Sequence, residues 1–235
     1  MLKPFSLEEA FVLHSRPYKE TSLIVELFTR NYGRVSVVAK GAKRPKSKIS
    51  VIKTPFSLFL VSCSGKGDLK NLTNSEIKRY FNPNQHSLNS LVYLNELLMR
   101  LLDKEDPHVE TFDNYLTFCS HLSSVGKKSL EAHLRMFELN LLKEIGYGVD
   151  LCFEANSDKK IKTDSIYIFD PMTGFQSTKT SVSKKNNFKG KDIINFSKGH
   201  LSDTETLTSS KQIMREAINS HLGNKPLKIR EYLSR

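Results

Sequence analysis

Five short β-like runs within the first 80 residues constrain the fold of this chain most strongly. Each run is rich in β-branched or aromatic residues, and together they cover residues 10–15, 22–29, 34–40, 56–62 and 69–77. The turn signal Asn31-Tyr32-Gly33 predicts a tight hairpin between the second and third runs, and the glycines of residues 64–68 predict another between the fourth and fifth. Five strands in so short a segment hide their edges by closing, so the sequence predicts a barrel of the oligonucleotide/oligosaccharide-binding (OB) type.

The hydrophobic period changes after Pro83, where apolar residues begin to recur at helical spacing. This spacing predicts three helices, over residues 88–104, 108–122 and 130–145. Gly146 and Gly148 supply the backbone freedom that the end of the third helix requires. We therefore expect the three helices to form a compact bundle.

The pattern is weaker beyond residue 151. It predicts a strand at residues 166–169, a loop at 184–191 and a helix at 202–221. We expect an α+β protein with three domains: a five-stranded OB barrel (1–80), an α-helical domain (81–150) and a small C-terminal subdomain that packs on the helical domain (151–235).

The positive charge is concentrated in the predicted barrel. The chain has 36 Lys and Arg against 25 Asp and Glu, and 15 of these basic residues against 6 of the acidic ones lie in residues 1–80. Such a balance favours a polyanionic partner, either nucleic acid or an acidic membrane surface. Since no apolar run approaches 18 residues, and Cys63, Cys119 and Cys152 fit no disulfide framework, we expect a cytoplasmic protein without a membrane span.

A basic loop lies between the third and fourth predicted strands. Gly41 and Pro45 exclude regular structure there, and the loop holds five cations, Lys40, Lys43, Arg44, Lys46 and Lys48. Cations so close together repel one another unless anions are near, which predicts contacts with nucleic-acid phosphates; the alternative is a solvated loop. Further cations are expected to join this surface from nearby turns: Arg16, Lys19, Arg34 and Lys66.

Two tyrosines lie beside these cations in the predicted turns. Tyr18 and Tyr32 are placed either to stack on an unpaired base or to pack on the rim of the barrel. Phe56 and Phe59 are expected to fill the interior of the barrel.

The sequence has no established catalytic motif. It contains no phosphate-binding GxxxxGK[ST] loop, no GxSxG elbow and no HExxH helix. Cys119 and His121 stand two apart on a predicted helix and point in different directions, which does not suit a zinc site. An acidic cluster could bind divalent cations in a nuclease, but it is more typical of a solvated face that caps helices: Asp103, Glu105, Asp106, Glu110 and Asp113.

Five segments resemble the bacterial RecO family of DNA repair and recombination mediators. They are residues 11–22, 33–42, 93–98, 135–148 and 225–231, and they occur in the family's order over most of the chain. The resemblance implies an OB barrel followed by helices, with no cofactor and no catalytic turnover. It also implies a protein of the nucleoid that binds single- and double-stranded DNA and anneals complementary strands. With RecR, it would act on DNA coated by single-strand-binding protein so that RecA can load.

The sequence departs from the family at a zinc motif. Many members have four cysteines just after the Gly-Tyr-Gly segment, whereas this chain has only Cys152, followed by Phe153. Because a structural zinc site needs four ligands, we expect no metal. The C-terminal subdomain is instead expected to pack around Ile166, Phe169 and Phe175.

The resemblance also implies a docking site for the acidic, hydrophobic-ended tail of single-strand-binding protein. The residues expected to form it are Leu134, Arg135, Phe137 and Leu141. Alternatively, Arg135 pairs with Glu131 or Glu138 of its own helix. Two other functions remain open at this point: an OB-fold RNA-binding protein and a metal-dependent nuclease.

Overall fold

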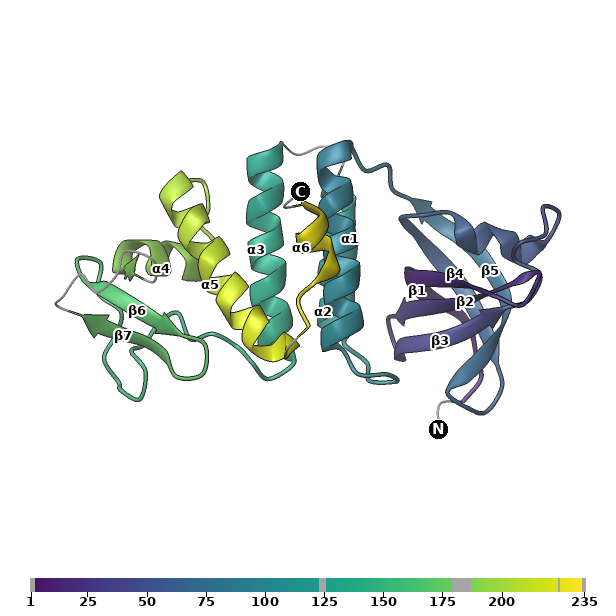
Figure 1. Cartoon of the computed structure of the whole chain (residues 1–235), viewed down its shortest axis with the longest axis horizontal. Coiled ribbons are helices and arrows are strands. Elements are labelled where there is room, and N and C mark those ends of the chain that lie inside the picture. The colour runs from purple at the N-terminus through teal and green to yellow at the C-terminus, as the bar shows by residue number, and fades with distance from the viewer. Residues whose placement is uncertain (1–2, 123–125, 179–186, 224, 234–235) are drawn as a thin grey trace. The chain divides into compact units, whose positions relative to one another are not determined.

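The computed structural model describes residues 3–122, 126–178, 187–223 and 225–233 (Figure 1). The chain forms two compact units, Met1–Ser124 together with Leu227–Arg235, and Val125–Pro226. Helices from the predicted helical segment 81–150 occur in both units. The division into three domains stays a prediction, as does the packing of a C-terminal subdomain on a helical one.

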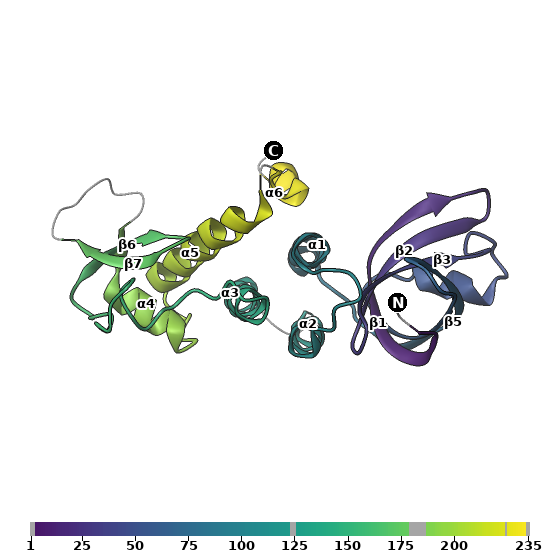
Figure 2. The same cartoon turned by 90° about the horizontal axis from the view of Figure 1, so that it is seen from below.

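The first unit begins with a closed five-stranded barrel, which Figure 2 shows from its end as a ring. The strands follow the order β1-β2-β3-β5-β4, in which β3 and β5 are parallel and the other pairs are antiparallel. This architecture confirms the predicted OB barrel. A 3₁₀-helix, η1 (Lys48–Lys53), lies between β3 and β4. The strands are β1 (Phe5–Tyr18), β2 (Ser22–Thr29), β3 (Gly33–Ala39), β4 (Ser57–Ser64) and β5 (Leu69–Tyr80).

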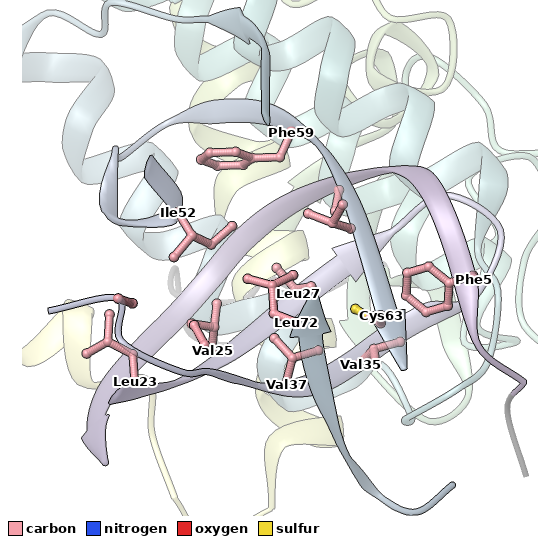
Figure 3. Close-up of a cluster of buried hydrophobic side chains, with 14 residues drawn as sticks. Phe5, Leu23, Val25, Leu27, Val35, Val37, Ile52, Phe59, Cys63 and Leu72 are labelled. Atoms are coloured by element: carbon pink, nitrogen blue, oxygen red, sulfur yellow. The ribbon is translucent and has the colours of Figure 1, made fainter. Parts of the chain in front are cut away.

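Alternate residues of β2, β3 and β4 fill the barrel, together with single residues of β1 and β5 (Figure 3). Val25 of β2 faces Val37 of β3, and neither exposes any surface to solvent. Ile52 of η1 covers the same core and is 2% exposed. Phe59 is fully buried in the core as predicted, but Phe56 lies outside the cluster, because its backbone adopts a left-handed φ of 50° in the connection before β4. Each fully buried aliphatic or aromatic side chain stabilises the fold by about 1.5–3 kcal/mol.

Two helices pack on the outside of the barrel through an aromatic cluster. These are α1 (Gln85–Leu101) and α2 (Val109–His121), close to the predicted bounds. The ring of Phe11 in β1 lies 5.3 Å from Phe112 and 4.8 Å from Tyr115 of α2, measured between ring centroids. Phe28 of β2 lies 5.3 Å from Phe112. Since all four rings are at most 2% exposed, they form a second core shared by the barrel and the helices.

Asn95 of α1 forms hydrogen bonds with the backbone of β1 where that strand is irregular. The register of β1 against β2 shifts between Val12 and His14, which is a β-bulge. The side-chain amide of Asn95 donates to the carbonyl oxygens of Val12 at 3.4 Å and Leu13 at 3.2 Å. Tyr115 in turn donates its hydroxyl to Oδ1 of Asn95 at 2.5 Å. The bulge therefore gives the helices a polar attachment to the barrel beside the aromatic one.

The segment that joins α1 to α2 crosses directly over the β2–β3 turn. The backbone N–H of Glu105 donates to the carbonyl oxygen of Arg34 at 3.0 Å, and Lys70 Nζ lies 2.9 Å from Glu105 Oε1. Gly33 has a φ of 65°, and a Cβ placed on it would lie 1.9 Å from the carbonyl oxygen of Asp106. Only glycine fits this crossing without displacing backbone.

The end of the chain returns to α1. Glu96 accepts hydrogen bonds from the backbone N–H groups of Lys228 at 2.7 Å and Ile229 at 3.0 Å, and so caps the first turn of α6 (Lys228–Leu233). The guanidinium of Arg230 lies over the ring of Tyr93, 5.6 Å from its centroid. These contacts explain why residues 227–233 belong to the first unit.

The second unit combines three helices with a small antiparallel sheet of order β7-β6-β8. Its elements are α3 (Lys127–Glu144), β6 (Ile166–Asp170), β7 (Gly174–Thr178), β8 (Asn187–Lys189), α4 (Gly190–Ser197) and α5 (Thr204–Leu222). The predicted helices at 130–145 and 202–221 and the predicted strand at 166–169 are confirmed. The predicted loop at 184–191 is wrong from residue 187 onward, and residues 184–186 lie outside the described part of the chain.

Aromatic residues hold this sheet together. Phe169 and Phe175 pack at a centroid distance of 4.7 Å, and both also contact Phe188 of β8. The expected packing around Phe169 and Phe175 is thus confirmed, whereas Ile166 is 38% exposed and the expectation for it was wrong. Strand alternation explains the difference, since Ile166 points to the face opposite that of the buried Tyr167. No helix among the described residues is long and apolar enough to cross a membrane.

The crossing at Gly33 gives a stability prediction. The substitution Gly33→Ala should lower the free energy of unfolding by about 2–4 kcal/mol, because the added Cβ meets the Asp106 carbonyl and the left-handed φ is unfavourable. Gly67→Ala is the matched control: no atom lies within 4 Å of its added Cβ, so the change should stay within about 0.5 kcal/mol. Urea unfolding measures both, and equal midpoints would contradict the described crossing.

Candidate nucleic-acid interface

The basic loop leaves the end of β3 with an ordered backbone. The N–H of Arg44 donates to the carbonyl of Gly41 at 2.9 Å, and the N–H of Ser47 donates to the carbonyl of Arg44 at 3.2 Å. Ala42 is fully buried and anchors the loop in the barrel core. Because the backbone is fixed in this way, the exposed basic side chains project from a defined surface.

The turn between β1 and β2 lies against this loop. The backbone N–H of Lys43 donates to the carbonyl of Thr21 at 3.0 Å, and Lys43 Nζ donates to the carbonyl of Lys19 at 3.1 Å. The ammonium of Lys19 lies over the ring of Tyr18, 5.4 Å from its centroid. Arg16, at the end of β1, is exposed beside them. The two connections therefore bring cations from separate parts of the sequence to one end of the barrel.

We call this surface the basic end. It includes Lys53, an exposed residue in the last turn of η1 that the sequence interpretation missed although it belongs to the same connection. None of its cations has an ion-pair partner within 4 Å among the described residues, so the basic end attracts anions from solution. The basic end consists of Arg16, Lys19, Lys40, Lys43, Arg44, Lys46, Lys48 and Lys53.

Lys66 does not lie at the basic end. In the parallel pairing of β3 with β5, Leu69 lies opposite Ser36 and Asn71 lies opposite Val38. The turn before Leu69 is therefore directed toward the beginning of β3, whereas Lys40 follows the end of β3. Lys66 is exposed, but it lies at the opposite end of the barrel from Lys40 and the rest of the basic end.

Arg34 and Tyr32 also lie away from the basic end. The guanidinium of Arg34 is 3.9 Å from the Glu26 carboxylate and hydrogen bonds to Met99 Sδ of α1 at 3.6 Å, and its side chain is only 13% exposed. The ring of Tyr32 stacks on Phe5 at 4.5 Å with an interplanar angle of 12°. Of the two roles considered for Tyr32, the structure thus shows packing on the rim of the barrel.

Three acidic side chains of the cluster considered for a nuclease have basic partners. Asp113 accepts two hydrogen bonds from Arg30, at 3.0 and 2.8 Å, and this contact raises the pKa of the Arg30 guanidinium. Glu105 pairs with the buried Lys70, and Asp106 lies 3.4 Å from His108. No three His, Cys, Asp or Glu side chains gather into a metal site within the described ranges. The geometry gives the nuclease hypothesis no support.

The cysteines also do not contribute to a metal site in the described part of the chain. Cys63 lies in the barrel core, where burial raises its pKa to about 12. Burial also raises the pKa of Cys119, whose thiol lies beside Tyr115, while His121 Nδ1 contacts the carbonyl of Thr117 at 2.7 Å. Cys152 is exposed. Raised pKa values keep the two buried thiols protonated at neutral pH and thus poor metal ligands.

Backbone hydrogen bonds close the loop in which the family's zinc motif would stand. Asp150 Oδ1 accepts from the N–H groups of Cys152 at 2.7 Å and Phe153 at 3.1 Å. The N–H of Ile161 donates to the carbonyl of Cys152 at 2.9 Å, and the N–H of Glu154 donates to that of Lys159 at 2.8 Å. A single cysteine does not supply the four ligands of a structural zinc site, so this donor set does not fit zinc.

The residues expected to bind the partner tail are buried on α3. Leu134, Arg135, Phe137 and Leu141 expose 9%, 6%, 4% and 1% of their surfaces. Arg135 Nη1 lies 3.0 Å from Oε2 of Glu138, which is itself fully buried. The structure therefore shows the alternative pairing of Arg135 with its own helix, and these four side chains do not form an open pocket.

Comparisons with known proteins find the same family along nearly the whole chain. The family models Recombination protein O N terminal and Recombination protein O C terminal match residues 5–81 and 86–231, so they meet where the barrel ends and α1 begins. Proteins named DNA repair protein RecO are similar throughout. That of Glaesserella parasuis is 39% identical over 95% of this chain and 93% of its own. That of Polynucleobacter asymbioticus is 40% identical over 96% and 94%, and that of Haemophilus influenzae 38% over 96% and 94%.

Proposed function

Because this chain belongs to the RecO family of recombination proteins, we propose that its basic end binds the phosphates of DNA during repair and recombination. The observation that carries the proposal is the convergence of eight cations at one end of an OB barrel, on two connections and the end of β1, with no ion-pair partner among the described residues. OB barrels commonly bind oligonucleotides through the surface of β2 and β3 and through connections that include the one between β1 and β2.

Contacts of this kind suit strand annealing. Cations that neutralise phosphates lower the repulsion between two strands and release condensed counterions, while the base edges stay free to pair. The reaction would need no catalytic residue and no cofactor, because the product is held together by its own base pairs. We therefore infer that this protein is a mediator rather than an enzyme, and that it works in the cytoplasm at the nucleoid.

We further propose that it acts with RecR on strands coated by single-strand-binding protein and so allows RecA to load. Support for these partners comes from membership of the family, not from a surface of this chain. A role in RNA binding would be equally compatible with the charge of the barrel, but the relatives are DNA repair proteins by name. Competition between DNA and RNA of the same sequence for the basic end distinguishes the two.

The tail of single-strand-binding protein is proposed to dock on α3 at Arg135, which requires Arg135 and its buried apolar neighbours to become accessible. The substitution Arg135→Lys keeps the charge that faces Glu138 but removes the planar fork that grips a carboxylate. It should weaken binding of a labelled tail peptide by about 1.5 kcal/mol or more and leave the affinity for naked DNA unchanged. Equal affinity of the variant and the unaltered protein for the peptide would remove Arg135 from the site.

The salt dependence of DNA binding tests the basic end. We choose Arg44, Lys46, Lys48 and Lys53 for substitution by Ala, since these side chains are exposed, and we leave Lys43, which supports the neighbouring turn. The slope of log K against log salt concentration is negative, and each lost phosphate contact reduces its magnitude by about 0.7 on single strands. The magnitude of the slope should therefore fall by up to about 3 in the fourfold variant. Binding of a fluorescent oligonucleotide at several salt concentrations measures the slope.

The fourfold variant also tests strand annealing. Complementary strands coated with the cognate single-strand-binding protein should anneal more slowly with the fourfold variant than with the unaltered protein. Lys66→Ala is the control, because it removes an exposed lysine from the opposite end of the barrel and should change neither slope nor rate. A fourfold variant that keeps the full slope and rate would show that the basic end is merely solvated.

A further inference from the structure

The last residue of β5 is an exposed aromatic side chain at the same end of the barrel as the basic end. Tyr80 is 57% exposed and pairs with Ser57, the first residue of β4. The connection that holds most of the basic end leads directly into β4, so Tyr80 lies where that connection enters the sheet. The 3₁₀-helix η1 also packs against β5 (Figure 1).

Further contacts place Tyr80 beside this connection. The N–H of Phe81 donates to the carbonyl of Phe56 at 3.1 Å and ties the end of β5 to the segment that follows η1. Lys53 is exposed in the last turn of η1, three residues before Phe56. Ile77, which precedes Tyr80 on the strand, is 39% exposed. Two exposed apolar side chains, Ile77 and Tyr80, therefore lie on the part of β5 that adjoins this connection.

The neighbours of Tyr80 have structural contacts that Tyr80 lacks. The guanidinium of Arg79 lies over the ring of Phe81, 4.8 Å from its centroid, and Lys78 forms an ion pair with Glu9. Within the described chain, the Tyr80 side chain makes no hydrogen bond and no ring contact. Its exposed ring is therefore available to a flat apolar ligand.

We propose that Tyr80 stacks on an unpaired base of a single DNA strand whose phosphates lie along the basic end. This inference rests on the proposed function and extends it, because phosphate contacts alone do not distinguish single strands from duplex. Every base presents a π-face, so a tyrosine beside a row of cations binds single strands without reading their sequence. In a duplex the bases are stacked on one another, and the ring of Tyr80 has no access to them.

The substitutions Tyr80→Ala and Tyr80→Phe test the proposal with an oligothymidylate and a duplex of equal length. Loss of one stacked base should weaken binding of Tyr80→Ala to the single strand by roughly 5- to 150-fold, with duplex binding and the salt slope unchanged. Tyr80→Phe keeps the ring and should bind as the unaltered protein does. An unchanged midpoint of urea unfolding shows that the barrel of the variant is intact.

Tyr147→Ala is the matched control, because this tyrosine of the second unit is similarly exposed, at 53%, but stacks on His221 at a centroid distance of 4.0 Å. It should not change the affinity for the oligothymidylate. Equal losses of Tyr80→Ala on single strand and duplex, or no loss on either, would overturn the stacking role. The fourfold variant of the basic end tests the proposed function separately. A reduced salt slope in that variant supports the proposed function even if Tyr80 does not stack. An unchanged slope contradicts the proposed function, whatever the Tyr80 variants show.

Discussion

The aromatic cluster between the barrel and α2 is the contact on which the rest of the first unit depends. Phe28 of β2 packs on Phe112, and next to it the outward-facing Arg34 of β3 contacts Met99 of α1. Part of the outer surface of β2 and β3, which OB barrels commonly offer to ligands, is therefore covered by helices. The connections at the far end of β3 remain exposed, and the unpaired cations gather there.

Several segments that resemble the family work as scaffold. Asn95 and Glu96 are adjacent on α1, yet Asn95 binds the bulge of β1 while Glu96 caps the helix at the end of the chain. Gly33 permits the crossing that joins the barrel to α2. Residues far apart in the sequence thus meet in one unit and hold it together.

The strands and most helices could be predicted from the sequence because their periods and turn signals are local. The position of Lys66 could not, because it depends on the parallel register of β5 against β3, and no turn signal specifies that register. For Arg34, strand alternation gives its outward direction but not the helix that covers it. For Arg135, helical spacing allowed either an exposed site or a pair with Glu138, and burial of both residues decides for the pair. Tyr80 was missed because the predicted fifth strand ended at residue 77.

Amide hydrogen exchange, measured with and without a single-stranded oligonucleotide, tests most directly whether one end of the barrel holds the DNA. The account predicts slower exchange on binding in residues 19–21 and 40–53 and at the end of β5, because these backbone segments lie under the bound strand. Exchange in residues 64–68, at the opposite end of the barrel, should not change. Protection confined to residues 64–68, or to the second unit alone, would contradict the account.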